Sequence, residues 1–171
     1  MEISLIKLSN EKKHEIYDML QEIPSDENGF INSMNGKSLK MFDHWLDVSI
    51  SKSLGRGLED WEVPQSIYLL LVDGYPVGMG KIRHELTEFL QKQGGNCAYA
   101  IRPSERSKGY GKILLKFLIK ETKKLNINKV LLTIRRDNNY SLNVALSNGG
   151  VIENQTSNKV YVWIFNKNDE L

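Results

Sequence analysis

The sequence has few of the residues that build disulfides, metal centres and membrane spans. Its 171 residues contain one cysteine, Cys97, so no disulfide can form within the chain. The three histidines, His14, His44 and His84, are scattered without metal-ligand spacing, so we expect no metal site. No apolar run approaches the roughly 20 residues of a membrane-spanning helix, and the first residues lack the apolar core of a signal peptide. We therefore expect a cytoplasmic protein that enters no membrane.

An excess of charge of one sign is also missing. Lysine and arginine number 23 and aspartate and glutamate 21, which leaves a net charge of +2, too small to indicate nucleic-acid binding. Hydrophobic residues make up 40% and charged residues 26%, close to globular averages, so extensive disorder is not expected. The length fits one domain spanning 1–171. A homodimer is compatible with the sequence but has no signal in it.

Apolar periodicity and turn residues predict a mixed α/β chain. The expected strands are 3–7, 66–72, 76–84, 96–102, 129–134, 151–155 and 159–165. The expected helices are 11–21, 39–54, 86–93, 109–125 and 138–148. Ser9 or Asn10 is expected to cap the first helix, Ser38 the second, and Asp137 or Asn138 the last, with a polar loop over 22–37. This order predicts the α/β fold class, with one central mixed sheet flanked by helices.

The segment 101–111 carries the clearest chemical signal. Here an expected strand leads through a proline and a glycine-containing loop into an apolar helix. The start of a helix exposes unpaired N–H groups and a partial positive charge, which suits a phosphate or pyrophosphate. Gly109 and Gly111 lack Cβ, so the oxygens of a ligand can approach the backbone closely. Arg106, Lys108 and Lys112 add positive charge nearby.

Two common phosphate-binding motifs do not fit this segment. A P-loop would require Ser or Thr after its lysine, whereas Lys112 is followed by Ile113. A dinucleotide fingerprint would require three glycines, and only two are present. The structural alternative is a surface loop rich in Gly, Ser and Lys. The succession of strand, proline turn, loop and apolar helix favours the phosphate site over that alternative.

The run Arg106-Ser107-Lys108-Gly109-Tyr110-Gly111 resembles the acetyl-CoA signature of the GNAT superfamily of N-acetyltransferases, Arg/Gln-x-x-Gly-x-Gly/Ala after a strand. The expected element order also resembles that family over nearly the whole chain. Residues 137–144, followed by Asn148-Gly149-Gly150, resemble the family's Asn-x-x-Ala/Ser helix. Together, 82–84, 94–95 and 101–106 resemble a bacterial subgroup known mainly as predicted acetyltransferases.

The resemblance implies a GNAT-like fold with a single splayed central sheet, and acetyl-CoA as cosubstrate. The backbone of Tyr99, Ala100 and Ile101 would pair with the pantetheine arm like an added strand. The amides from Ser107 to Lys112 would hold the pyrophosphate, and Asn138 and Ser141 would lie beside the pantetheine or the thioester. The residues expected to bind the cosubstrate are Tyr99, Ala100, Ile101, Arg106, Ser107, Lys108, Gly109, Tyr110, Gly111, Lys112, Asn138 and Ser141.

The catalytic groups are less clearly marked. Many family members carry a tyrosine, the acid for the leaving thiolate, at the position that Ala145 occupies here. Tyr140 is the nearby candidate acid, with an exposed or packing tyrosine as the alternative. His84, which titrates near neutrality, and Glu85 are the candidate bases, with a hydrogen-bonded strand-end histidine as the alternative. Cys97 fits a small buried residue better than a nucleophile.

Two further segments are candidates for contact with the acceptor. Arg135 and Arg136 could steer an anionic group, or form a solvated strand end. Residues 59–62 could form an acidic, aromatic rim for a cationic amine, or a plain exposed loop. The leading hypothesis is an acyl-CoA-dependent N-acetyltransferase that acts on a primary amine of a small molecule or peptide in a ternary complex. The alternatives are a non-catalytic CoA-binding sensor and an interaction module whose glycine loop is incidental.

Overall fold

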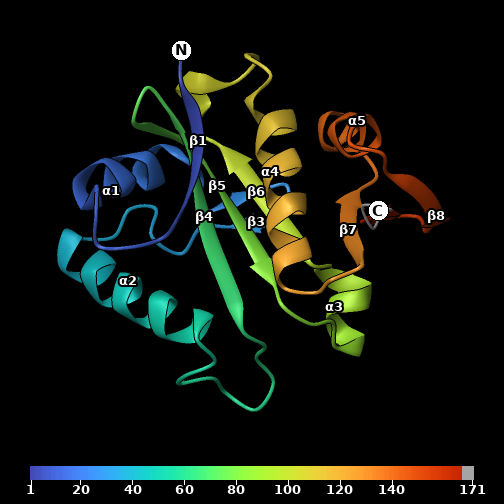
Figure 1. The fold of residues 1–171 in the computed structure, drawn as a ribbon, viewed down its shortest axis with the longest axis horizontal. Coiled ribbons are helices and arrows are strands. Elements are labelled where there is room, and N and C mark those ends of the chain that lie inside the picture. The colour runs from blue at the N-terminus through green and yellow to red at the C-terminus, as the bar shows by residue number, and fades with distance from the viewer. Residues whose placement is uncertain (167–171) are drawn as a thin grey trace.

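The computed structural model describes residues 1–166, which form two large antiparallel ladders and a short two-stranded hairpin, with helices packed around them (Figure 1). The first ladder has the order β1-β4-β5-β6 and the second the order β7-β9-β8. The strands are β1 (Ile3–Lys7), β4 (Gln65–Val72), β5 (Tyr75–Arg83), β6 (Cys97–Ile101), β7 (Lys129–Arg135), β8 (Val151–Gln155) and β9 (Lys159–Phe165).

Helices cover both faces of the first ladder, and one helix bridges to the second. In Figure 1, α1 and α2 lie on one side of the first ladder, while α4 lies on the other side with α5 beyond it. The helices are α1 (Lys13–Glu22), α2 (Leu39–Ser53), α3 (Glu88–Gln93), α4 (Tyr110–Lys124) and α5 (Asn139–Ser147), with a 3₁₀ turn at Pro103–Glu105. Each helix is placed by the apolar stripe that it buries.

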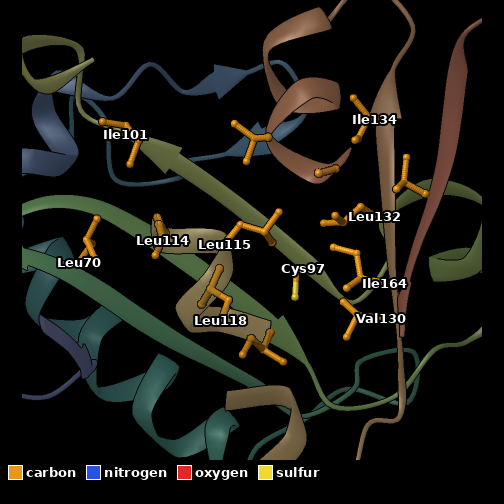
Figure 2. Close-up of a cluster of buried hydrophobic side chains, with 14 of the residues drawn as sticks. Leu70, Cys97, Ile101, Leu114, Leu115, Leu118, Val130, Leu132, Ile134 and Ile164 are labelled. Atoms are coloured by element: carbon orange, nitrogen blue, oxygen red, sulfur yellow. The ribbon is translucent and has the colours of Figure 1, made fainter. Parts of the chain in front are cut away.

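The hydrophobic core has two parts, separated by the first ladder. One part lies between that ladder and α1 and α2. The other surrounds α4 and joins both ladders, and Figure 2 shows Cys97 of β6 between the leucines of α4 (Leu114, Leu115 and Leu118) and the apolar side chains of β7. Because α4 packs against both ladders, it fixes how β6 and β7 lie relative to one another.

The two ladders meet at Asn96, the residue before β6. Its backbone N–H donates to the carbonyl of Leu131, and its side-chain Oδ1 accepts from the N–H of Leu131, both at 2.8 Å. Gly95 must lack a side chain here, because a Cβ on it would lie 2.4 Å from the Leu131 carbonyl oxygen, at φ +65°. Beyond this junction β6 and β7 share no ladder, so the sheet opens between them. This is the splayed sheet that the resemblance implied.

The observed elements confirm the predicted order of strands and helices, with Ser38 and Asn138 capping α2 and α5 as expected. The expected cap of the first helix was wrong. Lys12, in a left-handed conformation without a side-chain cap, precedes α1, whereas Ser9 Oγ accepts from the N–H of Glu11.

The expectation of a plain polar loop over 22–37 was also wrong. This segment contains a hairpin of β2 (Asp26–Glu27) and β3 (Phe30–Ile31). Asn28 and Gly29 form its turn with φ values of 51° and 93°, and Asn-Gly favours this kind of two-residue hairpin turn. The strands are too short to show alternation, so the turn residues were the available signal.

Candidate active site

A first cleft lies where β6 ends and α4 begins, and we call it the loop-side cleft. Its volume is about 280 Å³. It is lined by the hairpin turn, the end of β6, the loop before α4, and the first turns of α4 and α5: Glu27, Asn28, Tyr99, Ala100, Ile101, Glu105, Arg106, Ser107, Tyr110, Gly111, Asn138, Tyr140 and Ser141. The structure thus brings together most of the residues expected to bind acetyl-CoA.

The backbone at this cleft is suited to an anionic ligand. Within residues 1–166, the six consecutive amides from Ser107 to Lys112 have no hydrogen-bond acceptor. Gly109 precedes α4 without a side-chain cap, and no atom lies within 4 Å of where its Cβ would be. Unpaired amides at the start of a 15-residue helix form an anion site, which fits the pyrophosphate of acetyl-CoA.

Two of the three cations expected near the loop are engaged by carboxylates. Arg106 Nη2 lies 3.1 Å from Glu27 Oε2, and its Nε donates to the Ile101 carbonyl at 3.1 Å. Lys108 Nζ lies 2.8 Å from Glu105 Oε2. Arg106 therefore connects the loop to the β2–β3 hairpin as well as to the end of β6.

A buried ion pair holds the turn that leads into the loop. The Arg102 side chain is 4% exposed and pairs with Glu22 at the end of α1. Glu22 also accepts from the backbone N–H and the hydroxyl of Ser104. The hydrogen bond from Arg102 is the main reason that the pKa of Glu22 falls to about 2. The first helix and the loop are thereby tied together.

The free edge of β6 faces the gap between the ladders. Arg102 N–H donates to Val77, and the carbonyl of Asn96 accepts from Arg83, so even-numbered residues of this segment face β5. By the same alternation, the backbone groups of Tyr99 and the N–H of Ile101 face the gap, while those of Ala100 face β5. An extended chain could therefore pair with Tyr99 and Ile101 as an added strand.

A second cleft, the hairpin-side cleft, opens on the other side of the same gap. Its volume is about 210 Å³. Its lining residues come from the β2–β3 hairpin, β5, the end of α3, β6, β7, α5 and β9: Glu27, Asn28, Gly29, Phe30, Arg83, Gln93, Gly94, Cys97, Ala98, Tyr99, Leu132, Thr133, Ile134, Arg135, Asn138, Ser141 and Lys159. Five residues line both clefts, namely Glu27, Asn28, Tyr99, Asn138 and Ser141. The two clefts therefore meet between β6 and α5.

Two hydroxyl groups lie at this meeting point. The Tyr99 hydroxyl oxygen is buried and has no hydrogen-bond partner of normal geometry in the described chain. Burial raises the pKa of Tyr99, and the neighbouring Ser141 hydroxyl offsets only part of the rise. Ser141 itself is positioned by Asn138, whose Nδ2 donates to its Oγ at 2.9 Å. A neutral tyrosine with an unused hydroxyl at this position can donate a proton.

The candidate bases from the sequence lie outside both clefts. Arg83 already pairs with Asn96 at the junction of the ladders, so His84 lies past the closed end of the gap. His84 Nε2 is hydrogen-bonded to Ser66 Oγ at 2.8 Å, and burial, aided by the charge of Lys7, lowers its pKa. Glu85 is exposed and lines neither cleft. His84 matches the hydrogen-bonded strand-end alternative.

The other expected catalytic positions have distinct surroundings. Tyr140 is 57% exposed and lines the loop-side cleft, with its Cε1 3.7 Å from where a Cβ on Gly111 would be. Ala145 is fully buried in the core around α4. Cys97 is 4% exposed, and burial raises the pKa of its thiol to about 12, which argues against a thiolate nucleophile.

Glu27 is a functional candidate that sequence reasoning missed. It is the carboxylate that lines both clefts among the described residues. Its hairpin is held by Lys81 of β5, whose Nζ donates to the Ile31 carbonyl at 2.7 Å and lies 4.5 Å from the centre of the Phe30 ring. The Asn28-Gly29 turn was the signal that could have placed Glu27 on a hairpin rather than in a loop.

Two segments, 135–136 and 59–62, were candidates for contact with the acceptor. Of their residues, only Arg135 lines either of the two clefts. Arg135 lines the hairpin-side cleft, whereas Arg136 donates to the Thr156 carbonyl outside it. Trp61 and Glu62 border a separate hollow beside α2 and α3, where Glu62 pairs with Lys52. Residues 1–166 contain no group of three or more potential metal ligands, and none of their helices is long and apolar enough to cross a membrane.

Comparison with known proteins gives one family. Residues 17–149 match the acetyltransferase (GNAT) family. The RimL ribosomal L7/L12 α-N-protein acetyltransferase in complex with coenzyme A aligns with a TM-score of 0.73 and 12% identity, over 95% of this chain and 93% of that one. No curated protein matches the sequence.

Two further solved structures share the fold. A GNAT-family acetyltransferase from Streptococcus pneumoniae aligns with a TM-score of 0.64 and 16% identity, over 96% of this chain and 99% of that one. The spermidine N-acetyltransferase of Vibrio cholerae, in complex with CoA and spermine, aligns with a TM-score of 0.63 and 14% identity, over 95% of each chain. At these identities the likeness concerns the fold.

Proposed function

The chain belongs to the acetyltransferase (GNAT) family, and from that premise we propose that it transfers an acetyl group from acetyl-CoA directly to a primary amine of a small molecule or peptide. The observation that carries this proposal is the meeting of two clefts at five shared residues. One cleft suits an anionic, extended cosubstrate, and the other reaches the same point from the opposite side. Two substrates bound together can react without a covalent enzyme intermediate, and their positioning supplies much of the rate.

Acetyl-CoA supplies an acetyl group activated as a thioester. In the proposal, the free amides of Ser107 to Lys112 bind its pyrophosphate, with Lys112 adding positive charge and Tyr140 packing beside it. The open edge of β6 at Tyr99 and Ile101 pairs with its pantetheine arm, while Asn138 and Ser141 lie beside the thioester. Residues 1–171 would act as one domain, because β6, α4 and α5 contribute jointly to the site.

Proton transfer is assigned to residues at the meeting of the clefts. An amine is mostly protonated near neutral pH and must lose a proton before it attacks. Glu27 can accept that proton, directly or through a water molecule, because its carboxylate lines both clefts. The Tyr99 hydroxyl can donate a proton to the leaving thiolate, since it is buried at the same point without a partner. This role replaces the tyrosine that many family members carry at the position where this chain has Ala145.

The solved relatives support the choice of substrates. Coenzyme A is bound in the RimL complex, and CoA with an amine, spermine, in the Vibrio cholerae complex. For the present chain, acetyl-CoA and an amine are therefore the substrates to test.

Initial-rate kinetics test the proposal. Thiol release is measured while acetyl-CoA and an amine from a broad panel are varied together. Direct transfer predicts intersecting double-reciprocal lines, whereas parallel lines would indicate an acetylated enzyme and contradict it. Binding of acetyl-CoA with no thiol release for any amine would support the CoA-binding sensor instead, a reading that the buried Ala145 favours.

A further inference from the structure

The hairpin-side cleft has charges of opposite sign at its two ends. Four charged side chains line it: Glu27, Arg83, Arg135 and Lys159. Glu27 lies where the clefts meet and is held by Arg106. Arg135 is half-exposed, with its Nε 3.7 Å from Asp137. The other two cations, Arg83 and Lys159, are hydrogen-bonded to carbonyls at the end of α3, and Lys159 is also the strand partner of Arg135. Their partners determine what that end of the cleft can bind.

Arg83 presents a guanidinium with spare donors. Its Nη1 donates to the carbonyls of Gly94 and Gly95 at 3.1 and 3.2 Å. An arginine has five N–H donors arranged to bind carboxylate or phosphate with two parallel hydrogen bonds. No carboxylate pairs with Arg83 among residues 1–166. Its other N–H donors are therefore available to a ligand, and Arg83 lines both the hairpin-side cleft and the hollow beside α2 and α3.

Lys159 brings a second cation to the same place. Its Nζ donates to the backbone carbonyl of Gln93 at 3.2 Å and to the side-chain oxygen of Gln93 at 2.6 Å. Gln93 and Gly94 are consecutive, so the groups that anchor Lys159 and Arg83 are about 4 Å apart along the chain. None of the ion pairs in the described chain includes Lys159 either. The Lys159 ammonium and the Arg83 guanidinium thus lie together at the end of α3, with no carboxylate paired to either.

Strand geometry separates this cationic end from the reacting end. Arg83 pairs with Asn96, and Tyr99 lies three residues further along the same segment. Three strand residues span roughly 10 Å. The cleft thus has its carboxylate, which is paired with Arg106, at the point of reaction, and cations without a carboxylate partner about one small molecule's length away.

From this polarity we infer that the acceptor is zwitterionic: a primary amine that also carries a carboxylate or a phosphate, not a polyamine. Its ammonium group lies at Glu27, and its anionic group binds between Arg83 and Lys159. This inference rests on the proposed function, because it names the acceptor class of the same site.

The two cations also contact carbonyls at the C-terminal end of α3, where positive charge stabilises a helix. That role alone would make them stability residues and would leave acceptor choice unaffected. The preference of the enzyme for anionic over neutral amines therefore distinguishes acceptor binding from helix stabilisation. A change in thermal stability does not distinguish them.

A matched series of amines tests the inference. The probes are ω-aminohexanoate, aminopentyl phosphate, ω-aminohexanol and diaminohexane, which place an anion, a hydroxyl or a second ammonium at similar distance from the reacting amine. Binding to the CoA-saturated protein is measured by calorimetry, and kcat/KM with acetyl-CoA by thiol release. We expect at least one anionic probe to exceed the alcohol by about tenfold, as one charge-assisted hydrogen bond would give, and the diamine to be poorest. The two anionic probes distinguish carboxylate from phosphate recognition.

Substitutions at Lys159 test whether the preference for anionic amines arises at the cationic end of the hairpin-side cleft. Lys159→Gln should raise KM for the anionic probe about tenfold while leaving kcat and the KM of the alcohol unchanged. Lys159→Arg should retain the preference. Lys116→Gln, on the exposed face of α4 and outside both clefts, removes the same charge and should change nothing.

The inference would be overturned if diaminohexane matched the anionic probes, if no anionic probe bound at millimolar concentration, or if Lys159→Gln kept the preference. In each of these cases acetyl-CoA turnover with other amines would leave the proposed function standing. A protein that does not bind acetyl-CoA would instead count against the proposed function itself.

Discussion

Glu27 occupies the point where a nucleophilic amine would lose its proton. Its position depends on a two-residue turn and on the Arg106 guanidinium 3.1 Å away, which holds the carboxylate between the two clefts. The histidine favoured by the sequence directly follows β5, outside both clefts, where it is hydrogen-bonded to Ser66. Substitution of each residue can therefore show whether Glu27 or His84 is the general base.

Replacing Glu27 by Gln should lower kcat by more than a hundredfold near pH 7, within the usual range for loss of a general base. The loss should shrink above about pH 9, because more of the amine is then already neutral. Rates are measured across pH, with thermal unfolding as a check on folding. Glu85→Gln is the matched control and should leave kcat unchanged. Wild-type rates in Glu27→Gln, together with a large loss in His84→Ala, would return the role to the histidine.

Tyr99 should show opposite effects on catalysis and stability. Tyr99→Phe removes a buried hydroxyl that lies near Ser141 but forms no hydrogen bond of normal geometry, so the free energy of unfolding should stay the same or rise by up to about 1 kcal/mol. Loss of a proton donor should lower kcat by about a hundredfold, with little change in acetyl-CoA affinity. Because burial raises the pKa of Tyr99, the wild-type hydroxyl stays protonated through neutral pH.

Steady-state rates and thermal melts of Tyr99→Phe are measured together with those of Tyr75→Phe, a half-exposed tyrosine at the β4–β5 turn. A Tyr99→Phe enzyme with unchanged kcat would show that the thiolate leaves without this hydroxyl.

Among the elements, the junction of the two ladders determines whether the gap exists. Gly95→Ala would place a Cβ 2.4 Å from the Leu131 carbonyl oxygen, so the Asn96–Leu131 hydrogen bonds must shift. We expect a loss of about 3 kcal/mol in the free energy of unfolding, or roughly 6–12 °C in Tm.

Gly149→Ala provides the control for Gly95→Ala, because Gly149 has a similar φ of +84° but no atom within 4 Å of its Cβ position. It should cost only the backbone strain of about 1 kcal/mol. Equal losses in the two variants would mean that the close approach at Leu131 contributes nothing.

The pair between α1 and the turn before the loop makes stability depend on pH. The pKa of Glu22 is lowered from 4.5 to about 2, so its contribution is present above about pH 4.5 and is lost as the pH falls toward 2. Glu22→Gln should lower stability at pH 7 by roughly 2 kcal/mol, a figure reduced for the one-third exposure of this carboxylate.

The difference in Tm between wild type and Glu22→Gln is followed from pH 7 to below pH 3. It should narrow across the acid window, because protonation of Glu22 removes the same interaction in the wild type. A constant difference across that window would contradict the assignment.

Local signals explain which elements could be predicted. The Ser38 and Asn138 caps and the apolar stripe of α4 act between residues close in sequence, and all three are found in the structure. The hairpin at 26–31 was missed because its strands are two residues each. Only its Asn-Gly turn carried information.

For the whole molecule, the order of elements was predictable but the register between distant strands was not. The sequence marked His84 as a candidate base by its residue type and its place at the end of an expected strand. The observed register puts Arg83 opposite Asn96, so His84 lies beyond the closed end of the gap. Similarly, Arg83 and Lys159 are 76 positions apart, and only the folded end of α3 brings them together. Contacts between side chains so far apart in sequence depend on how distant strands and helices pair, and local sequence patterns do not encode that pairing.

The fold persists among relatives that share only 10–16% of their residues with this chain. Function therefore has to be argued from the site and not from the fold. The central claim is that acetyl-CoA binds across the start of α4 and along the free edge of β6.

Amide hydrogen exchange with and without acetyl-CoA tests that claim most directly, because unpaired amides exchange rapidly until a ligand engages them. We expect strong protection from Ser107 to Lys112 and at Tyr99 and Ile101, with exchange in α2 and the β8–β9 hairpin unchanged. Unchanged exchange from Ser107 to Lys112, with protection elsewhere in a protein that binds acetyl-CoA, would contradict it.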